Sequence, residues 1–200
     1  MKKSFIFFFD LETTGVNQAI HGIHQISGCV VDDGQMKIVE RFDFRVKPFG
    51  DDAIDQQALD VAGVTIADFS SDKYEDPGVV HRKITNMVGK YIDKFDRNQK
   101  MFLAGYNNAS FDNGLFRKFF EKNGDKYFGS LFWSNSIDVM VMATAFLMNQ
   151  RREMVNFKLS TVAEFMGIEV DESKLHDAQF DIELTMAIYC KVANIKPGYQ

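Results

Sequence analysis

Two carboxylates stand two positions apart at the end of the first apolar run of this 200-residue chain. The run is Phe5-Ile6-Phe7-Phe8-Phe9, and Asp10 and Glu12 follow it, just before Thr13-Thr14-Gly15. Side chains two apart on a strand share a face, so the two carboxylates repel each other unless a positive group lies between them. A divalent cation is the simplest such partner. The alternative is that Asp10 is a turn residue and Glu12 a solvated one.

Two later segments carry acids in matching contexts. Asn108-Ala109-Ser110-Phe111-Asp112 precedes a helical pattern, and His176-Asp177-Ala178-Gln179-Phe180-Asp181 leads into a second one. By position alone the favoured role of Asp112 is a helix N-cap, which needs no metal. Asp177 is the natural N-cap of the last helix, so Asp181 lies about one turn inside it. A lone histidine before a helix, such as His176, is usually a surface residue. This one lies five positions before Asp181 and follows two other acidic segments, which makes a role in chemistry harder to dismiss.

Hydrophobic periodicity predicts the strands that position these acids. The run at residues 5–9 is apolar throughout, which is typical of a strand covered on both faces. A second strand is expected at 23–31 and an alternating antiparallel strand at 38–46, joined by a turn at 32–35. A short buried strand at 101–105 leads into the second acidic segment.

The remaining segments predict helices. Residues 51–69 form short helical pieces, one of them capped by Thr65. Apolar residues recur at helical spacing from Val80 to Phe95, which predicts an amphipathic helix with His81 exposed on it.

Three further helices are expected in the second half of the chain. Asp138 is predicted to cap a helix that runs to Leu147, and Ser160 or Thr161 to cap one that ends at Gly167. The last helix runs from Ile182 to Val192.

Composition indicates one soluble domain over residues 1–200. The chain is 46% hydrophobic and 26% charged, which is ordinary for a globular protein, and its length suits a single core. No apolar run approaches the roughly 18 residues that span a membrane, and Met1-Lys2-Lys3-Ser4 leads into the first strand without a cleavage site. We therefore expect a cytoplasmic protein without a membrane partner.

The cysteines and two of the histidines are not expected to bind metal. Cys29 and Cys190 lie far apart in apolar surroundings, which favours buried free thiols and weakly supports a reducing compartment. His21 and His24 form an H-x-x-H pair, but it spans a loop and the start of a strand rather than one helix face, so a zinc site is not favoured there.

Taken together, the three acidic segments resemble the DEDDh family of 3′–5′ exonucleases, the DnaQ-like group that includes proofreading subunits of bacterial replicative polymerases. Asp10-Leu11-Glu12-Thr13-Thr14-Gly15 resembles the first motif, Asn108-Ala109-Ser110-Phe111-Asp112 the second and His176-Asp177-Ala178-Gln179-Phe180-Asp181 the third. Order and separation also fit. Two connecting segments, Val46-Lys47-Pro48 and Lys158-Leu159-Ser160-Thr161, are similar to the family too.

The resemblance implies an α/β fold of the ribonuclease H-like kind, with a mixed β-sheet flanked by helices on both faces. It implies that two Mg²⁺ or Mn²⁺ ions are bound and that His176 activates the attacking water. Oxygen ligands suit these ions better than zinc. The metal ligands would be Asp10, Glu12, Asp112 and Asp181, and the residues that contact the terminal nucleotide would be Leu11, Thr13 and Phe111.

The chain departs from the family pattern at two places that carry no metal ligand. Asn107 stands where many members have a histidine before the second motif. Ala62-Gly63-Val64-Thr65 stands where many have His-Gly-Ile-Thr, which leaves open how the terminal nucleotide is held.

The predicted function is a metal-dependent 3′–5′ exonuclease that releases nucleoside 5′-monophosphates from single-stranded 3′ ends. DNA is the favoured substrate, in proofreading or repair, with a polymerase subunit as a further partner; trimming of RNA 3′ ends is the alternative. The net charge of −5 disfavours tight binding to long duplexes, although two Mg²⁺ ions would cancel the charge of four ligand carboxylates. A non-catalytic polymerase- or nucleic-acid-binding module is disfavoured, because a binder has no use for four acids beside His176.

Overall fold

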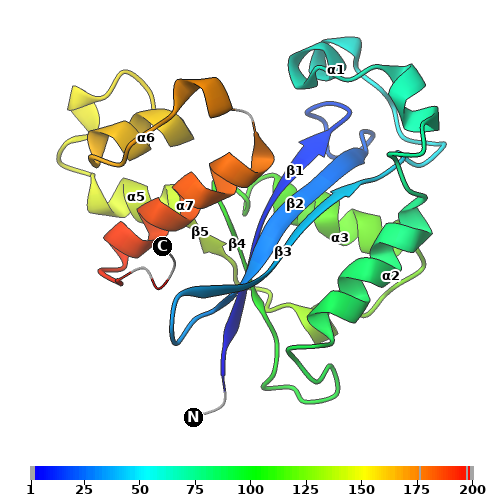
Figure 1. Cartoon of the computed structure of the whole chain (residues 1–200), viewed down its shortest axis with the longest axis horizontal. Helices are drawn as coiled ribbons and strands as arrows, with labels where there is room; N and C mark the ends of the chain where they lie inside the picture. Colours follow the sequence, from blue (N-terminus) through cyan, green and yellow to red (C-terminus); the bar gives the residue numbers. More distant parts are fainter. Residues whose placement is uncertain (1–2, 176, 197, 199–200) are drawn as a thin grey trace.

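A five-stranded mixed sheet forms the centre of the structure, a computed structural model that describes residues 3–175, 177–196 and 198 (Figure 1). Its strand order is β3-β2-β1-β4-β5. β2 pairs antiparallel with both β1 and β3, whereas β1, β4 and β5 run parallel. The strands are β1 (Phe5–Thr13), β2 (Ile23–Asp32), β3 (Lys37–Arg45), β4 (Phe102–Gly105) and β5 (Ile137–Asp138).

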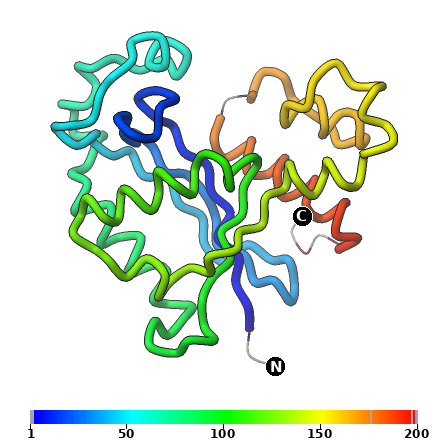
Figure 2. Tube along the Cα trace, turned by 180° about the vertical axis from the view of Figure 1, so that it is seen from behind, coloured from blue at the N-terminus to red at the C-terminus, as the bar shows by residue number. Residues whose placement is uncertain are grey.

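Helices cover both faces of the sheet, as predicted, and the view from behind shows the same two layers (Figure 2). One face carries α2 (Pro77–Val88), α3 (Asp112–Lys122) and α4 (Phe128–Leu131). The other carries α5 (Val139–Phe146), α6 (Leu159–Phe165) and α7 (Ala178–Val192). Close to the end of β1 lies α1 (Gln56–Ala62). The short 3₁₀ helices are η1 (Ile66–Ser70), η2 (Arg151–Glu153) and η3 (Glu172–Lys174).

Strand β1 is buried on both faces because both helical layers pack on it. Phe7 belongs to the core on the α2 and α3 side, and its ring stacks on Phe42 with centroids 4.7 Å apart. Phe8 belongs to the core on the α5 to α7 side and meets Tyr189 of α7 edge-on at 5.6 Å. Because side chains alternate along a strand, Asp10 and Glu12 lie on the same side as Phe8, toward α7.

Several local predictions are confirmed. The turn at 32–35 is closed by a hydrogen bond from the Gln35 N–H to the Asp32 carbonyl (3.2 Å). Thr65 and Asp68 form a capping box at the start of η1. Both cysteines are buried, and neither forms a disulfide within the described residues. A separate finding concerns membrane-spanning segments: none of the helices in the described part of the chain combines the length and the apolar composition that such a segment needs.

Two helix boundaries were predicted wrongly. α2 ends at Val88 rather than near Phe95, because the Val88 carbonyl accepts from the Tyr91 N–H within a turn, and Phe95 is 85% exposed. α6 begins at Leu159 without a Ser160 or Thr161 cap. Asn156 explains the earlier start, since its side-chain oxygen accepts from the Lys158 N–H (2.9 Å) and also from the Thr161 hydroxyl.

The predicted exposure of His81 was also wrong. Its ring nitrogen lies 3.0 Å from the Asp125 carboxylate, and its side chain is only 14% exposed. The ring also meets Phe120 edge-on at 4.7 Å. Asp125 lies 44 positions away in the sequence, so helical periodicity carried no sign of this pairing.

His24 on β2 is buried without a hydrogen-bond partner for either ring nitrogen among the described residues. The side chain is 1% exposed, and its ring lies 5.9 Å from that of Phe69. Burial, and then the positive charge of Arg45, lowers the pKa of His24 to about 4. The neighbouring His21 instead accepts a hydrogen bond from the Asn17 N–H (3.0 Å).

The low pKa of His24 predicts a loss of stability in acid. An unfolded histidine binds a proton near pH 6.5, whereas the folded one does so only near pH 4, so His24 favours folding above pH 6.5 and loses that contribution as the pH falls toward 4. His24→Phe keeps a ring and cannot titrate. Between pH 7.5 and 5, the free energy of unfolding should fall by about 2 kcal/mol more for wild type than for the variant. This figure takes about 1.4 kcal/mol for each pH unit below 6.5. Urea unfolding of both proteins measures this, and parallel pH profiles would contradict it.

Candidate active site

The end of β1 is held in place by the loop that follows Glu12. The Thr14 hydroxyl donates to the Ala53 carbonyl (2.6 Å) and accepts from the Gly22 N–H (3.0 Å). Gly15 has φ +154°, and a Cβ there would lie 2.4 Å from the ring of His21. The Thr-Thr-Gly sequence after the acids therefore builds a close backbone packing that fixes where β1 ends.

Asp112 is the first residue of α3 and not its N-cap. Phe111 occupies the N-cap position, without a side-chain hydrogen bond. The helix starts early because the Asn108 carbonyl accepts from the Asn113 N–H (2.9 Å), and the Asn108 and Asn113 side chains are also hydrogen-bonded (3.1 Å). The cap role that position alone favours for Asp112 is therefore wrong. Asp112 is only 7% exposed, and a cap role does not explain why this acidic residue is buried.

Asn107 adopts a left-handed backbone conformation with φ 64°. Asparagine and histidine both occur at positive φ more often than most residues do, which accounts for Asn107 where many family members have histidine. The Ser110 hydroxyl donates to the Asn107 carbonyl (3.1 Å), and the Asn107 N–H donates to the Asp138 carboxylate (3.2 Å). The loop from β4 to α3 is thus a tight turn with defined hydrogen bonds.

The third acidic segment is built as predicted around the start of α7. The Asp177 carboxylate caps the helix by accepting from the Phe180 N–H (3.0 Å). Asp181 lies in the first turn and is half-buried. His176, the expected general base, lies outside the described residues, so its role stays a prediction.

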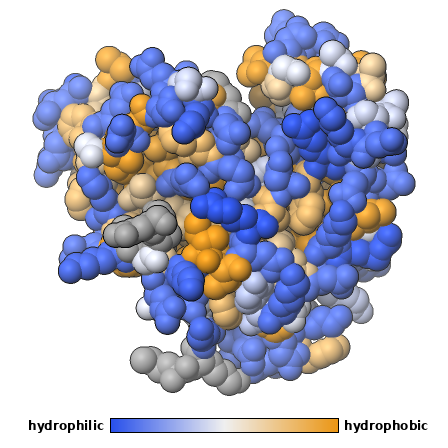
Figure 3. Space-filling view, viewed as in Figure 1, coloured by the Kyte–Doolittle hydropathy of each residue, from blue (hydrophilic) through white to orange (hydrophobic). Residues whose placement is uncertain are grey.

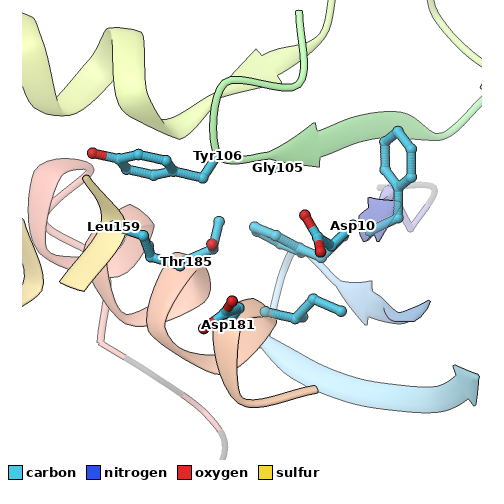
Figure 4. A pocket seen from close by; sticks show the side chains of 9 residues that line it. Asp10, Gly105, Tyr106, Leu159, Asp181 and Thr185 are labelled. Carbon is cyan, nitrogen blue, oxygen red and sulfur yellow. The ribbon is translucent and has the colours of Figure 1, made fainter. Parts of the chain in front are cut away.

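Asp10 and Asp181 line one cavity of about 190 Å³ between β1, β4 and α7. Figure 4 shows their carboxylates on two sides of this cavity, which Tyr106, Leu159 and Thr185 also line. The sequence had not singled out Tyr106 or Thr185. Thr185 follows Asp181 by four positions, which places both on one helix face, and this spacing could have identified it.

Negative charge converges on Asp10. Burial is the largest cause that raises the pKa of Asp10 above its usual range, and the charges of Asp112, Glu12 and Asp181 follow. A hydrogen bond from the Leu11 backbone opposes them. The structure thus brings all four predicted acids close enough for Asp10 to respond to the other three.

Asp112 is affected in the same way. Burial raises the pKa of Asp112 to about 7, and the charges of Glu12 and Asp138 add to the effect. Backbone hydrogen bonds, from Asp112 itself and from Leu11, lower it in part. The Leu11 amide therefore lies beside both Asp10 and Asp112, although these acids come from different elements.

The chemistry of this site fits a divalent cation. Carboxyl groups with raised pKa values gain from any partner that stabilises their charged form, and carboxylate oxygen is the ligand that Mg²⁺ and Mn²⁺ prefer. No three described His, Cys, Asp or Glu side chains form a ready-made metal cluster. The indication of a cation is therefore the converging charge and not a preformed coordination shell.

The predicted nucleotide contacts lie around the same strand end. Leu11 is 6% exposed within the core on the α3 side, and Phe111 packs at the edge of that core. The Thr13 hydroxyl donates to the Gly15 carbonyl (3.0 Å). Ala62 is the last residue of α1, which Gly63 ends with φ 64°, and the Asp55 N–H at the start of α1 donates to the Thr14 carbonyl (2.7 Å). The segment of Ala62 is thus joined to the loop that follows β1.

Comparison with known proteins agrees with this geometry. The RNase_T family model, described as "Exonuclease", matches residues 7–189. Ribonuclease T of Hahella chejuensis is 23% identical over 188 residues, which cover 92% of this chain and 81% of that protein.

Two solved structures are similar over almost the whole chain. E. coli Exonuclease I in complex with a dT13 oligonucleotide has a TM-score of 0.75 and 24% identity, covering 97% of this chain and 42% of that one. The zinc-bound form of the E. coli Exonuclease I complex with single-stranded DNA has a TM-score of 0.74 and 23% identity, covering 96% and 40%. The chain thus spans less than half the length of the Exonuclease I chains.

These likenesses confirm the predicted ribonuclease H-like fold. The family model covers most of the chain, from the first strand to the last helix. The chain therefore belongs to the RNase_T exonuclease family, within the DEDDh group of 3′–5′ exonucleases.

Proposed function

We propose that this chain is a metal-dependent 3′–5′ exonuclease that removes nucleotides from the 3′ ends of single-stranded DNA. The observation that carries the proposal is the response of Asp10 to the charges of Asp112, Glu12 and Asp181. These acids come from three separate elements of the chain. A structural role gives no reason to gather them, whereas phosphoryl chemistry with divalent cations does.

In this proposal Asp10, Glu12, Asp112 and Asp181 hold two Mg²⁺ or Mn²⁺ ions. The chemistry that the two ions supply when bound is stabilisation of the attacking and leaving oxygens in an in-line displacement at phosphorus. Zinc is a weaker candidate because the predicted ligands are all carboxylates, without Cys or His. The relative whose structure is a zinc-bound form is E. coli Exonuclease I.

The protein side chains bind the strand end and handle the proton. His176 takes a proton from water, and the water oxygen forms a bond to the phosphorus of the last phosphodiester. The bond from phosphorus to the 3′ oxygen of the preceding nucleotide breaks, and this oxygen takes up a proton from solvent. The products are a nucleoside 5′-monophosphate and a strand shortened by one nucleotide that ends in a 3′-hydroxyl.

The strand end is proposed to enter near the carboxyl end of β1. Three residues around the carboxyl end of β1 would contact the terminal nucleotide: Leu11, Thr13 and Phe111. Figure 3 shows a notch in the upper surface of the molecule, between the α5 and α6 side and the α1 side. A strand lying in the notch would pass above the site.

DNA is favoured because the structures with the similar fold are complexes of E. coli Exonuclease I with DNA. Trimming of RNA 3′ ends is the second candidate, and its support is the similarity to a protein named Ribonuclease T. Discrimination depends on how a 2′-hydroxyl is accommodated. Roles in replication or repair and a polymerase partner stay predictions of the family resemblance.

We further propose that residues 1–200 form a single exonuclease domain and that it works in the cytoplasm. The two buried cysteines, which form no disulfide within the described residues, support a reducing compartment. The helical layers that pack on opposite faces of one sheet support a single domain.

The proposed function is tested with oligonucleotides labelled at the 5′ end. Single-stranded DNA and RNA of the same sequence are incubated with Mg²⁺, Mn²⁺ or EDTA, and a circular single-stranded DNA serves as control. The proposal expects stepwise shortening of linear DNA with either metal, no reaction in EDTA and an intact circle. Cleavage of the circle at a comparable rate would indicate an endonuclease, and faster loss of RNA would favour the second candidate.

Removing single ligands should abolish turnover without unfolding the protein. Asp10→Asn, Asp112→Asn and Asp181→Asn each remove a charged metal ligand and keep the side-chain shape. We expect shortening of linear DNA to be lost in all three, while circular dichroism stays as in wild type. Glu183→Gln is the matched control. Glu183 lies on the same helix as Asp181, but its carboxylate forms an ion pair with Arg41 (2.8 Å) and is not a predicted metal ligand. Wild-type turnover by any of the three would remove that residue from the proposed site.

His176→Ala should have a different effect. Loss of a general base lowers kcat by roughly 10²–10⁴-fold, whereas metal affinity should change little. The acidic limb of the pH–rate profile, which we attribute to imidazole protonation, should disappear in the variant. If the limb persists in His176→Ala, another group is the base.

Asp112→Asn should raise stability in the metal-free protein. With its pKa raised from 3.8 to about 7, the carboxyl group contributes stability that is complete below pH 4 and is lost as the pH rises through 7. Between pH 5 and 8, the free energy of unfolding in EDTA should therefore fall by about 3 kcal/mol more for wild type than for the variant. This figure takes about 1.4 kcal/mol for each pH unit between 5 and the pKa of about 7.

Metal should act in the opposite sense on the same pair of proteins. At 100 times its Kd, Mn²⁺ stabilises a folded protein by about 2.7 kcal/mol, and the variant should gain less than wild type. Urea unfolding at both pH values, with EDTA or Mn²⁺, measures both effects. A variant that is less stable than wild type in EDTA at pH 8 and gains as much from Mn²⁺ would show that Asp112 is a structural residue.

A further inference from the structure

Asp138 is a buried carboxylate that joins two parts of the chain. It is the last residue of β5 and the N-cap of α5, and it is 7% exposed. Its Oδ1 accepts from the N–H groups of Met140 (3.0 Å) and Val141 (3.2 Å), which cap the helix as predicted. The same Oδ1 also accepts from the Asn107 N–H (3.2 Å), and Oδ2 accepts from the Ala109 N–H (3.1 Å).

The bonds to Asn107 and Ala109 fix the loop that carries Asp112. Strand β4 ends at Gly105, which pairs in register with Asp138. The chain then turns through Asn107, with its left-handed φ of 64°, and reaches α3 within a few residues. A left-handed non-glycine residue is held only where its surroundings determine it. The Asp138 carboxylate supplies that constraint, because it accepts hydrogen bonds from the backbone of Asn107 and Ala109.

A helix cap alone does not require an aspartate at this position. Serine caps a helix about as well with a single oxygen. Aspartate instead places a further negative charge near the site, and that charge raises the pKa of Asp112. The presence of this unfavourable charge is explained if the second carboxylate oxygen of Asp138, Oδ2, is needed to accept the hydrogen bond from the Ala109 N–H.

We propose that Asp138 is a positioning residue, which holds the turn at 107–109 so that Asp112 is presented to the metal ions. The inference rests on the proposed function, in which Asp112 is a metal ligand. Asp138 itself touches neither metal nor substrate in this account. Its contribution passes through the backbone amides of Asn107 and Ala109.

Three substitutions separate the cap from the loop. Asp138→Ser keeps one oxygen, which is one bond closer to the backbone and can cap the helix. It removes Oδ2, the acceptor for Ala109, and leaves that single oxygen to serve both the cap and the Asn107 N–H. Asp138→Asn keeps the Oδ1 bonds and puts an amide donor against the Ala109 N–H, so it should show a smaller effect of the same kind. Asp171→Ser is the control, since Asp171 caps η3 through the Ser173 N–H (3.1 Å) outside the proposed site.

The first readout needs no metal and no activity. Amide hydrogen exchange in EDTA should be at least about tenfold faster for residues 107–111 in Asp138→Ser than in wild type, while α5 keeps its protection. The second readout is Mn²⁺ binding followed by electron paramagnetic resonance. Loss of a residue that orients a metal ligand typically weakens metal affinity about 10–100-fold, and we expect this range for Asp138→Ser and no change for Asp171→Ser.

The outcomes distinguish the inference from the function on which it rests. A folded Asp138→Ser with wild-type exchange in the loop, or with Mn²⁺ affinity within twofold of wild type, would reduce Asp138 to a helix cap and overturn the inference alone. If Asp138→Ser does not fold, the same comparison is made with Asp138→Asn. A wild type that binds no Mn²⁺ and shortens no strand would overturn the proposed function, and the inference with it.

Discussion

Repulsion between carboxylates at the carboxyl end of β1 is the interaction on which the rest of the site depends. Burial and the charges of Glu12, Asp112 and Asp181 all raise the pKa of Asp10. Such an arrangement is unfavourable by itself, because buried like charges lack the hydration that separates them in water. It is maintained by the packing of the strand and the two helices that carry these residues, and divalent cations would turn the same charge into binding energy.

The aromatic core explains how the molecule tolerates this charge. Phe7 and Phe8, both fully buried, anchor β1 against opposite helical layers. The strand therefore cannot shift to move Asp10 into solvent without exposing large rings on both faces, at about 25 cal/mol per Å² of apolar surface. The second acidic segment is held by backbone hydrogen bonds to Asp138, and the third by the Asp177 cap of α7.

The sequence predicted features that depend on local pattern and missed those that depend on distant partners. The spacing of Asp10 and Glu12 placed them on one strand face, and Asp177 was correctly predicted to cap α7. Position alone favours a cap role for Asp112 and is misleading there. The hydrogen bond from the Asn113 N–H to the Asn108 carbonyl, with which the helix starts earlier, has no local signature in the sequence. The hydrogen bonds that Asp138 accepts from Asn107 and Ala109 depend on the pairing of β4 with β5. Hydrophobic periodicity along the sequence does not reveal this pairing.

Proton release on metal binding tests the central claim most directly. If buried carboxyl groups hold protons in the metal-free protein, Mn²⁺ must displace them when it binds. Calorimetric titration at pH 6.5 in two buffers of different ionisation enthalpy should show that protons are released when Mn²⁺ binds. Because the pKa of Asp112 is about 7, the release should be smaller at pH 8.5. Binding at pH 6.5 without proton release, or no binding at all, would contradict the account.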